Sequence, residues 1–325
     1  MKLRKQSQVQ RYICLGGALA VAMMAVCGMA CRLGRWLPLS RREPVSLAAG
    51  SFNQPSSGFF SSPPARRVIN AAISTYGGMR NWRATEGLEL EMVWKTYEGT
   101  RVIEDPALVQ MATTPAPQIR IHYSKIDQVL ALGDKGPWAM VRGQPDQSPS
   151  IVERAHYTAA TMSFFLSLPF YLKDRGVVVR GVETKNWGGQ VFDAVTVGFQ
   201  GGSYPWRADM MTLWFRRPTS VLERCFFVST GKGSGFDPPP NYRWITWENH
   251  TPLNGIPLAR RWSFFRAESD GTMKEKLFDI EVTSAMGNRS FLPVLFREPV
   301  IEPRIQRLPL VGGEKVIPVP ISPKP

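Results

Sequence analysis

The spacing of apolar residues has two periods along the chain. From Gly87 the period is two: Leu88, Leu90, Met92 and Trp94 alternate with more polar neighbours, which predicts a strand with one buried and one solvated face. Less regular alternation predicts further strands at Gln118–Ser124, Gln128–Leu132, Trp138–Arg142, Val177–Thr184, Val191–Phe199, Ala208–Arg216, Val221–Ser229, Tyr242–His250, Leu258–Ala267 and Lys274–Thr283. About eleven strands joined by hairpin-length turns predict one long antiparallel meander.

The second period is helical and is strongest in Ile151–Leu172. Ala155, Ala159 and Met162 recur at steps of three and four residues, and the apolar residues then surround the whole helix up to Leu168. A helix apolar on all sides is buried on more than one side. One such helix among many strands is expected to lie against a sheet, which is also the arrangement of a sheet that curls around an apolar occupant.

Shorter segments complete this prediction. Ala65–Tyr76 is expected to form a helix, because its apolar residues share one face and Gly77-Gly78 follows. Met79–Arg83 is predicted to be a loop into the first strand. Glu104-Asp105 precedes Pro106, so this segment is also assigned to a solvated loop.

The N-terminal sequence predicts a membrane or export segment in residues 1–31. A basic start is followed by an uncharged run from Tyr12 to Cys31. Gly28-Met29-Ala30-Cys31 is similar to the acylation site of bacterial lipoproteins, so three alternatives stay open: a cleaved signal peptide, a lipoprotein signal acylated at Cys31, or an uncleaved anchor. All three place the rest of the chain outside the cytoplasm or on a membrane.

The expected organisation continues with a basic linker rich in Ser, Pro and Gly at 32–64, a folded domain at 65–292 and a Pro-rich tail at 293–325. The charge follows these boundaries. The whole chain carries a net charge of +14, but residues 1–67 hold ten Lys and Arg against one acidic residue, Glu43. Positive charge beside an apolar segment is typical of a membrane flank, so no nucleic-acid partner is expected.

The sequence offers little for catalysis or metal binding. His122, His156 and His250 have no common spacing, and of the four cysteines only Cys225 belongs to the predicted domain. Gly231–Gly235 follows a strand but leads into Phe236-Asp237 and a run of Pro, so no helix N-terminus is available to bind phosphate. We therefore predict no catalytic residues, no metal and no cofactor.

Three motifs together resemble the lipoprotein localisation factors, the LolA/LolB-like superfamily of envelope proteins. They are Tyr76-Gly77-Gly78 with Trp82 before the first strand, the segment Leu166–Asp174 where the central helix ends, and Thr251–Leu258 as a late hairpin. The resemblance implies an α+β fold in which a large antiparallel sheet curls into an unclosed half-barrel, with helices covering its concave face. It also implies an apolar cavity for acyl chains.

The residues expected to line this cavity are chosen from the alternation along the strands and the central helix. They are Leu90, Met92, Trp94, Met140, Met162, Phe165, Leu168, Met210, Trp214 and Phe227. Plain core packing is the competing interpretation for each, because a cavity wall and a core wall have the same sequence pattern.

Three functions are compatible with these features. The first is a membrane-tethered, non-catalytic protein of the periplasmic cell envelope, or a secreted one, that binds a lipid or an acylated protein. The second is a sensor or scaffold domain of the same fold with a packed interior and a protein partner. The third is an envelope hydrolase, which the lack of a nucleophile–base motif disfavours.

Overall fold

The computed structural model describes residues 63–99, 101–114, 116–174, 176–199, 208–229 and 241–299. The leader at 1–31 with Cys31, nearly all of the linker, the Gly231–Gly235 loop and the end of the tail lie outside these residues. The helices are α2 (Pro63–Thr75), α3 (Gly78–Ala84) and α4 (Pro149–Ser167), with 3-10 turns η1 (Phe170–Lys173) and η2 (Pro293–Phe296).

The strands form one antiparallel sheet of 13 strands in the order β6-β5-β4-β3-β2-β1-β13-β12-β11-β10-β9-β8-β7. Their bounds are β1 Gly87–Glu98, β2 Arg101–Ala112, β3 Gln118–Tyr123, β4 Gln128–Gly133, β5 Gly136–Val141, β6 Gln144–Pro145, β7 Val177–Trp187, β8 Gln190–Phe199, β9 Ala208–Arg216, β10 Leu222–Ser229, β11 Asn241–Leu253, β12 Ile256–Ala267 and β13 Met273–Gly287. The pairing of β1 with β13 joins the first and last strands of the described residues in the middle of the sheet.

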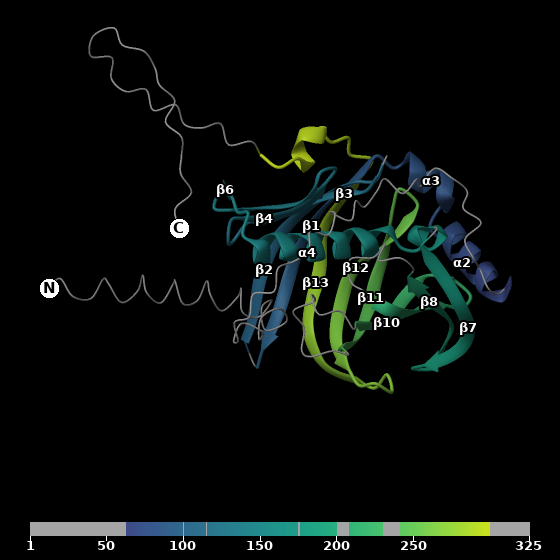
Figure 1. The fold of residues 1–325 in the computed structure, drawn as a ribbon. Helices are drawn as coiled ribbons and strands as arrows, with labels where there is room; N and C mark the ends of the chain where they lie inside the picture. Colours follow the sequence, from purple (N-terminus) through teal and green to yellow (C-terminus); the bar gives the residue numbers. More distant parts are fainter. Residues whose placement is uncertain are drawn as a thin grey trace, which may run out of the picture.

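The predicted fold class is confirmed: the sheet curls but does not close, and the helices lie on its concave side (Figure 1). Helix α4 connects β6 to β7, which are the two edges of the sheet. A connection between opposite edges must cross the sheet, and α4 does so over the concave face, against β3, β4 and β5. The central helix therefore fills the half-barrel because of its position in the chain as well as its apolar composition.

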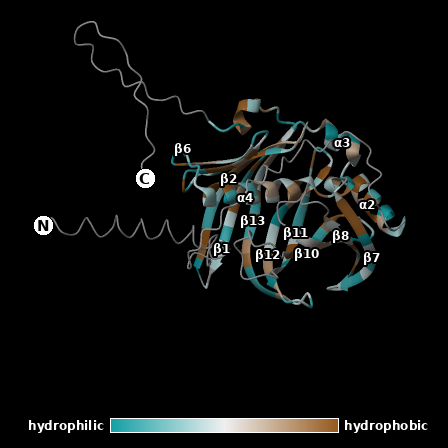
Figure 2. Cartoon of the chain, viewed as in Figure 1, coloured by the Kyte–Doolittle hydropathy of each residue, from teal (hydrophilic) through white to brown (hydrophobic). Residues whose placement is uncertain are grey.

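The alternation predicted for the first strand is confirmed in β1. Leu88, Leu90, Met92 and Trp94 are all buried in the core on the concave side. Figure 2 shows hydrophobic and hydrophilic segments alternating along the strands. The same core includes the apolar faces of α2, α3 and α4, so one continuous cluster joins the sheet to its helices.

Two segments assigned to loops are regular structure instead. Met79–Arg83 lies within α3, where the indole of Trp82 stacks on Phe170 with ring centroids 4.7 Å apart. The burial of this one aromatic side chain fixes the short helix, although the surrounding polar residues suggested a loop.

The second corrected segment is Glu104-Asp105-Pro106, which lies inside β2. A strand residue directs its N and its C=O to the same side. The Pro106 carbonyl accepts a hydrogen bond from Ser124 N on the β3 side, just past the last β2–β3 pair at Ala107 and Tyr123. The missing N–H of Pro106 therefore breaks no ladder bond. Asp105 is buried rather than solvated, and burial raises its pKa.

The face opposite the core carries its own apolar clusters. The larger one contains Phe192, Trp214 and Trp244. Trp187, at the tip of the β7–β8 hairpin, covers them, with its ring centroid 6.0 Å from that of Trp214 and 5.7 Å from that of Trp244. Part of the opposite face is therefore also buried and apolar. An apolar strand residue can for this reason lie on either face of the sheet.

Beyond residue 292, η2 packs against the end of β4 and β5. Trp138 Nε1 donates a hydrogen bond of 2.8 Å to the Phe296 carbonyl, and the Phe296 side chain is 1% exposed. A Cβ at Gly133 would collide with the same carbonyl, so glycine is required for this close approach.

Candidate functional site

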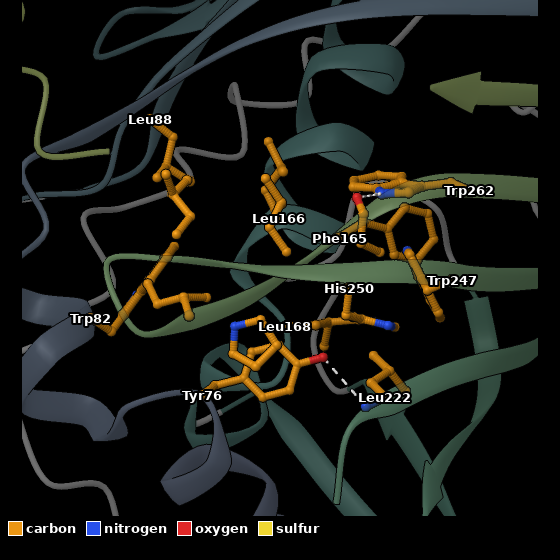
Figure 3. Close-up of a pocket in the computed structure, with 15 residues that line it drawn as sticks. Tyr76, Trp82, Leu88, Phe165, Leu166, Leu168, Leu222, Trp247, His250 and Trp262 are labelled. Atoms are coloured by element: carbon orange, nitrogen blue, oxygen red, sulfur yellow. Dashed lines mark hydrogen bonds between the residues drawn. The ribbon is translucent and has the colours of Figure 1, made fainter. Parts of the chain in front are cut away.

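An apolar cavity lies where α4 ends over β11 and β12 (Figure 3). Its volume is about 40 Å³. Its walls come from five parts of the chain: α3 with the turn before it, the start of β1, the end of α4, the start of β10, and the β11–β12 hairpin. The side chains are Tyr76, Trp82, Leu88, Phe165, Leu166, Leu168, Leu222, Trp247, His250, Leu253, Ile256, Pro257, Leu258, Ala259 and Trp262.

Phe165 is the aromatic centre of this wall. Its ring contacts Trp247, Trp262 and Phe264 edge to face, with centroid separations of 5.6, 6.4 and 6.4 Å. Such pairs contribute about 0.5–1.5 kcal/mol each beyond the burial of area. The last turn of α4 is thus attached to β11 and β12 chiefly by aromatic packing.

The backbone of Leu222 connects the other side of the cavity. Its N–H donates to the hydroxyl of Tyr76 at 3.3 Å, and the imidazole of His250 also hydrogen-bonds the Leu222 backbone. Burial raises the pKa of Tyr76 and lowers the pKa of His250. Both side chains are therefore neutral near pH 7, as an apolar wall requires. Figure 3 shows His250 lying among Leu168, Trp247 and Leu222.

Seven of the ten residues predicted to line the cavity belong to the concave core. They are Leu90, Met92, Trp94, Met162, Phe165, Leu168 and Phe227. Among them, Phe165 and Leu168 line the cavity itself. The other five lie elsewhere in the same core.

The structure does not bring the other three, Met140, Met210 and Trp214, together with these seven. Met140 packs against the opposite-face cluster of Val129, Ala131 and Trp138, and Trp214 belongs to the opposite-face aromatic cluster. Met210 is four residues from Trp214 along β9 and so shares its face. The neighbours Met211 and Leu213 are the β9 residues that enter the concave core.

Trp247 and Trp262 were missed by the sequence prediction. In β11 two tryptophans stand three residues apart, Trp244 and Trp247, so they face opposite sides. The strand has a tryptophan on each face, and the sequence contains no signal that shows which of the two tryptophans faces the concave side. Trp262 could have been recognised as a buried residue, because it is a large apolar side chain in a predicted strand. The sequence does not show whether it faces the concave or the opposite side of the sheet.

The described residues contain few groups suited to chemistry. No group of three or more His, Cys, Asp or Glu within this part of the chain is arranged to hold a metal ion. Cys225 is fully buried, and burial raises the pKa of its thiol, so it is unreactive. Of the helices in the described ranges, none has the length and hydropathy of a membrane span.

The buried histidines predict a pH dependence of stability. Burial lowers the pKa of both His156 and His250. The unfolded chain, with an ordinary pKa of about 6.5, then binds more protons than the fold does, so the free energy of unfolding falls as the pH drops below about 6.5. We expect His156→Gln and His250→Gln each to flatten this decline, measured by urea denaturation at several pH values between 8 and 5.

Each variant must be compared with the wild type, because other groups also make the stability depend on pH. Burial raises the pKa of Glu223, so Glu223 makes the free energy of unfolding rise as the pH falls, opposite to the histidines. Equal slopes in wild type and both variants would contradict the assignment.

Comparison with known proteins gives a match in structure only. No family model matches the sequence, and no curated protein matches it either. A DUF1329 family protein from Desulfovibrio piger has a TM-score of 0.50 and 10% identity, covering 73% of this chain and 98% of that one. This likeness shows a shared fold.

Two further solved structures match with lower scores. A LolA superfamily protein from Nitrosomonas europaea has a TM-score of 0.46 and 12% identity, covering 72% of this chain and 97% of that one. A putative outer membrane lipoprotein-sorting protein domain from Vibrio parahaemolyticus has a TM-score of 0.42 and 9% identity, covering 71% and 97%. One of these structures is named for the superfamily that the sequence resembles.

Proposed function

We propose that this protein is a non-catalytic, membrane-tethered protein of the bacterial cell envelope that binds one acyl chain of a lipid or an acylated protein. The observation that carries the proposal is the apolar cavity between α4 and the β11–β12 hairpin, lined by Phe165, Trp247 and Trp262. The tether and the periplasmic location rest on the sequence patterns of residues 1–64.

The size of the cavity defines how binding must occur. About 40 Å³ is enough for only a few water-sized probes, since one water needs about 10–15 Å³ on this measure. Small-molecule sites usually have about 300–1,000 Å³. An acyl chain can therefore enter only if the last turn of α4 moves away from β11 and β12.

The contacts of α4 are compatible with such a movement. The helix end meets β11 and β12 through the rings of Phe165 and not through ion pairs. Aromatic contacts can be replaced by contacts with an alkyl chain at little cost, since both are apolar.

The small cavity also favours a second candidate, a sensor or scaffold domain with a packed interior and a protein partner. The two functions predict different ligands. We expect mass spectrometry of a lipid extract from the full-length protein to show bound acyl species, with the mature N-terminus determined on the same sample. Absence of acyl species after expression in several hosts, together with no binding of a fluorescent fatty acid, would favour the scaffold.

A substitution at the cavity tests the location. Ala259 lines the cavity, and Ala259→Val adds two methyl groups that fill it. The added methyl groups occupy space that the acyl chain would take, and an overlap that costs about 1.4 kcal/mol of binding free energy should weaken binding of the fluorescent fatty acid about tenfold. The matched control is Ala285→Val in β13, where Ala285 is partly buried against the same core but lines no part of the cavity. Equal effects of the two substitutions would place the acyl chain elsewhere.

A further inference from the structure

A polar cleft of about 490 Å³ adjoins the apolar cavity. It forms where the β10–β11 ladder stops. The last pair of that ladder is Arg224 with Thr246, whereas β11 continues to Leu253 alongside β12. Trp247 and His250, in this continuation, line both the cleft and the cavity.

The cleft contains two cations and two anions. Arg216 and Glu223 form an ion pair, with 2.6 Å between Nε and Oε1. Arg224 and Glu248 carry the other two charges. A purely anionic ligand would meet the two carboxylates as well as the two guanidinium groups, so the cleft favours a ligand that carries both signs.

Arg224 has unused hydrogen-bonding capacity. Its guanidinium carbon lies 4.9 Å from the ring centroid of Trp187 and 5.9 Å from that of Phe192. These rings hold the cation in place. Arg224 is half-buried, and its Nε has no hydrogen-bond partner among the described residues. Because Nε itself is covered, a phosphate in the cleft would meet the terminal nitrogens of the guanidinium. Guanidinium groups bind phosphate well because their donors match phosphate oxygens.

Glu248 supplies the complementary group. Its carboxylate is exposed, and Oε1 accepts a hydrogen bond of 3.4 Å from the Thr246 hydroxyl. This long contact leaves the carboxylate available to accept hydrogen bonds from a protonated amine.

We propose that this cleft binds a zwitterionic lipid headgroup, a phosphate joined to a primary amine, as in phosphatidylethanolamine. Arg224 binds the phosphate, Glu248 binds the amine, and the acyl chain passes His250 into the cavity. The position of the acyl chain rests on the proposed function, whereas the binding of the headgroup does not. The cleft has the volume of a small-molecule site, about 300–1,000 Å³.

The test uses the full-length protein and three ligands: dihexanoyl phosphatidylethanolamine, dihexanoyl phosphatidylglycerol and the fluorescent fatty acid. We expect the ethanolamine lipid to bind about tenfold more tightly than the glycerol lipid. Arg224→Gln should weaken both phospholipids on the order of tenfold and leave the fatty acid unchanged. Glu248→Gln should reduce or abolish the preference for the ethanolamine lipid.

Controls separate folding from binding. Arg266→Gln and Glu275→Gln change an exposed ion pair on the β12–β13 hairpin and should alter none of the affinities. Arg224→Lys keeps the charge over the aromatic rings and should retain more binding than Arg224→Gln. If Arg224→Gln does not fold, the exposed Glu248 still decides the question.

The outcomes distinguish the two proposals. Equal affinity for the two phospholipids in the wild type, or no effect of Glu248→Gln, overturns the headgroup assignment, while fatty-acid binding would leave the proposed function intact. If phosphoethanolamine alone binds and the fatty acid does not, the cleft is a site for a polar molecule and the acyl-binding function fails.

Discussion

Replacing Asp279 with alanine is expected to lower the free energy of unfolding by about 3–5 kcal/mol. The Asp279 side chain is fully buried, and its Oδ2 accepts hydrogen bonds from Tyr97 OH at 2.6 Å and from Arg261 at 2.8 Å. Lys276 lies 3.1 Å away. Removing the carboxylate deletes the hydrogen bonds from Tyr97, Arg261 and Lys276 together, and hydrogen bonds to a charged group contribute about 1.5–3 kcal/mol each.

The acid sensitivity of Asp279 gives a second measurement of the same network. Burial raises the pKa of Asp279, but hydrogen bonds from Ser263, Tyr97, Arg261 and Lys276 outweigh burial and lower it to about 2. Because the folded pKa is below the ordinary value, the stabilisation is complete above about pH 4 and is lost as the pH falls toward 2. Wild type and Asp279→Ala should therefore converge in stability at low pH.

The control is an exposed pair nearer the turn of the same β12–β13 hairpin. Glu275→Ala removes the partner of Arg266, and both side chains are largely solvated. Pairs of this kind contribute about 0–1 kcal/mol. Urea denaturation at pH 7 that gave equal losses for Asp279→Ala and Glu275→Ala would contradict the role of Asp279.

Phe165→Ala is expected to destabilise the protein by about 3–5 kcal/mol and to enlarge the apolar cavity. Phe165 is 5% exposed and contacts Trp247, Trp262 and Phe264. Its removal deletes these contacts from the end of α4. The control is Leu292→Ala, because Leu292 is 75% exposed and should change stability by no more than about 0.5 kcal/mol.

The same variant separates a binding role from a packing role. An enlarged apolar cavity stays dry and accepts small apolar molecules. If the acyl chain enters beside Phe165, the variant should bind the fluorescent fatty acid at least as tightly as the wild type below its unfolding temperature. A ligand that binds only the folded state should also raise the melting temperature of the variant. Loss of binding in a folded variant would contradict this entry position.

How far the sequence predicted the site depended on whether one face of each strand was polar. In β1, Glu89 and Glu91 alternate with Leu90 and Met92, so the buried face was unambiguous and the prediction is confirmed. In β9, Met210 and Trp214 alternate with Met211, Leu213 and Phe215, and both sets are apolar. Trp187, at the tip of the β7–β8 hairpin, packs on the face that carries Trp214. This contact joins residues that are far apart in the sequence.

The segment that contains Pro106 shows a similar limit. Proline argues against a central strand because it lacks an N–H. In β2 the missing donor falls just past the end of the β2–β3 ladder, so no bond is lost. Only the register of the neighbouring strand determines this, and register is not visible in the local pattern.

The sequence by itself determined the strand alternation, the buried central helix and the antiparallel hairpins, because periodicity and turn residues act over a few neighbours. The prediction of one long meander was wrong: α4 divides the strands into two meanders, β1–β6 and β7–β13, which pair through β1 and β13. The tertiary structure decided which faces became the concave core, that α4 spans the sheet from edge to edge, and that the cavity and the polar cleft meet at Trp247 and His250. These features depend on contacts between residues far apart in the chain, such as β1 with β13 and Tyr76 with Leu222. The local pattern is compatible with more than one such set of contacts, and packing selects among them.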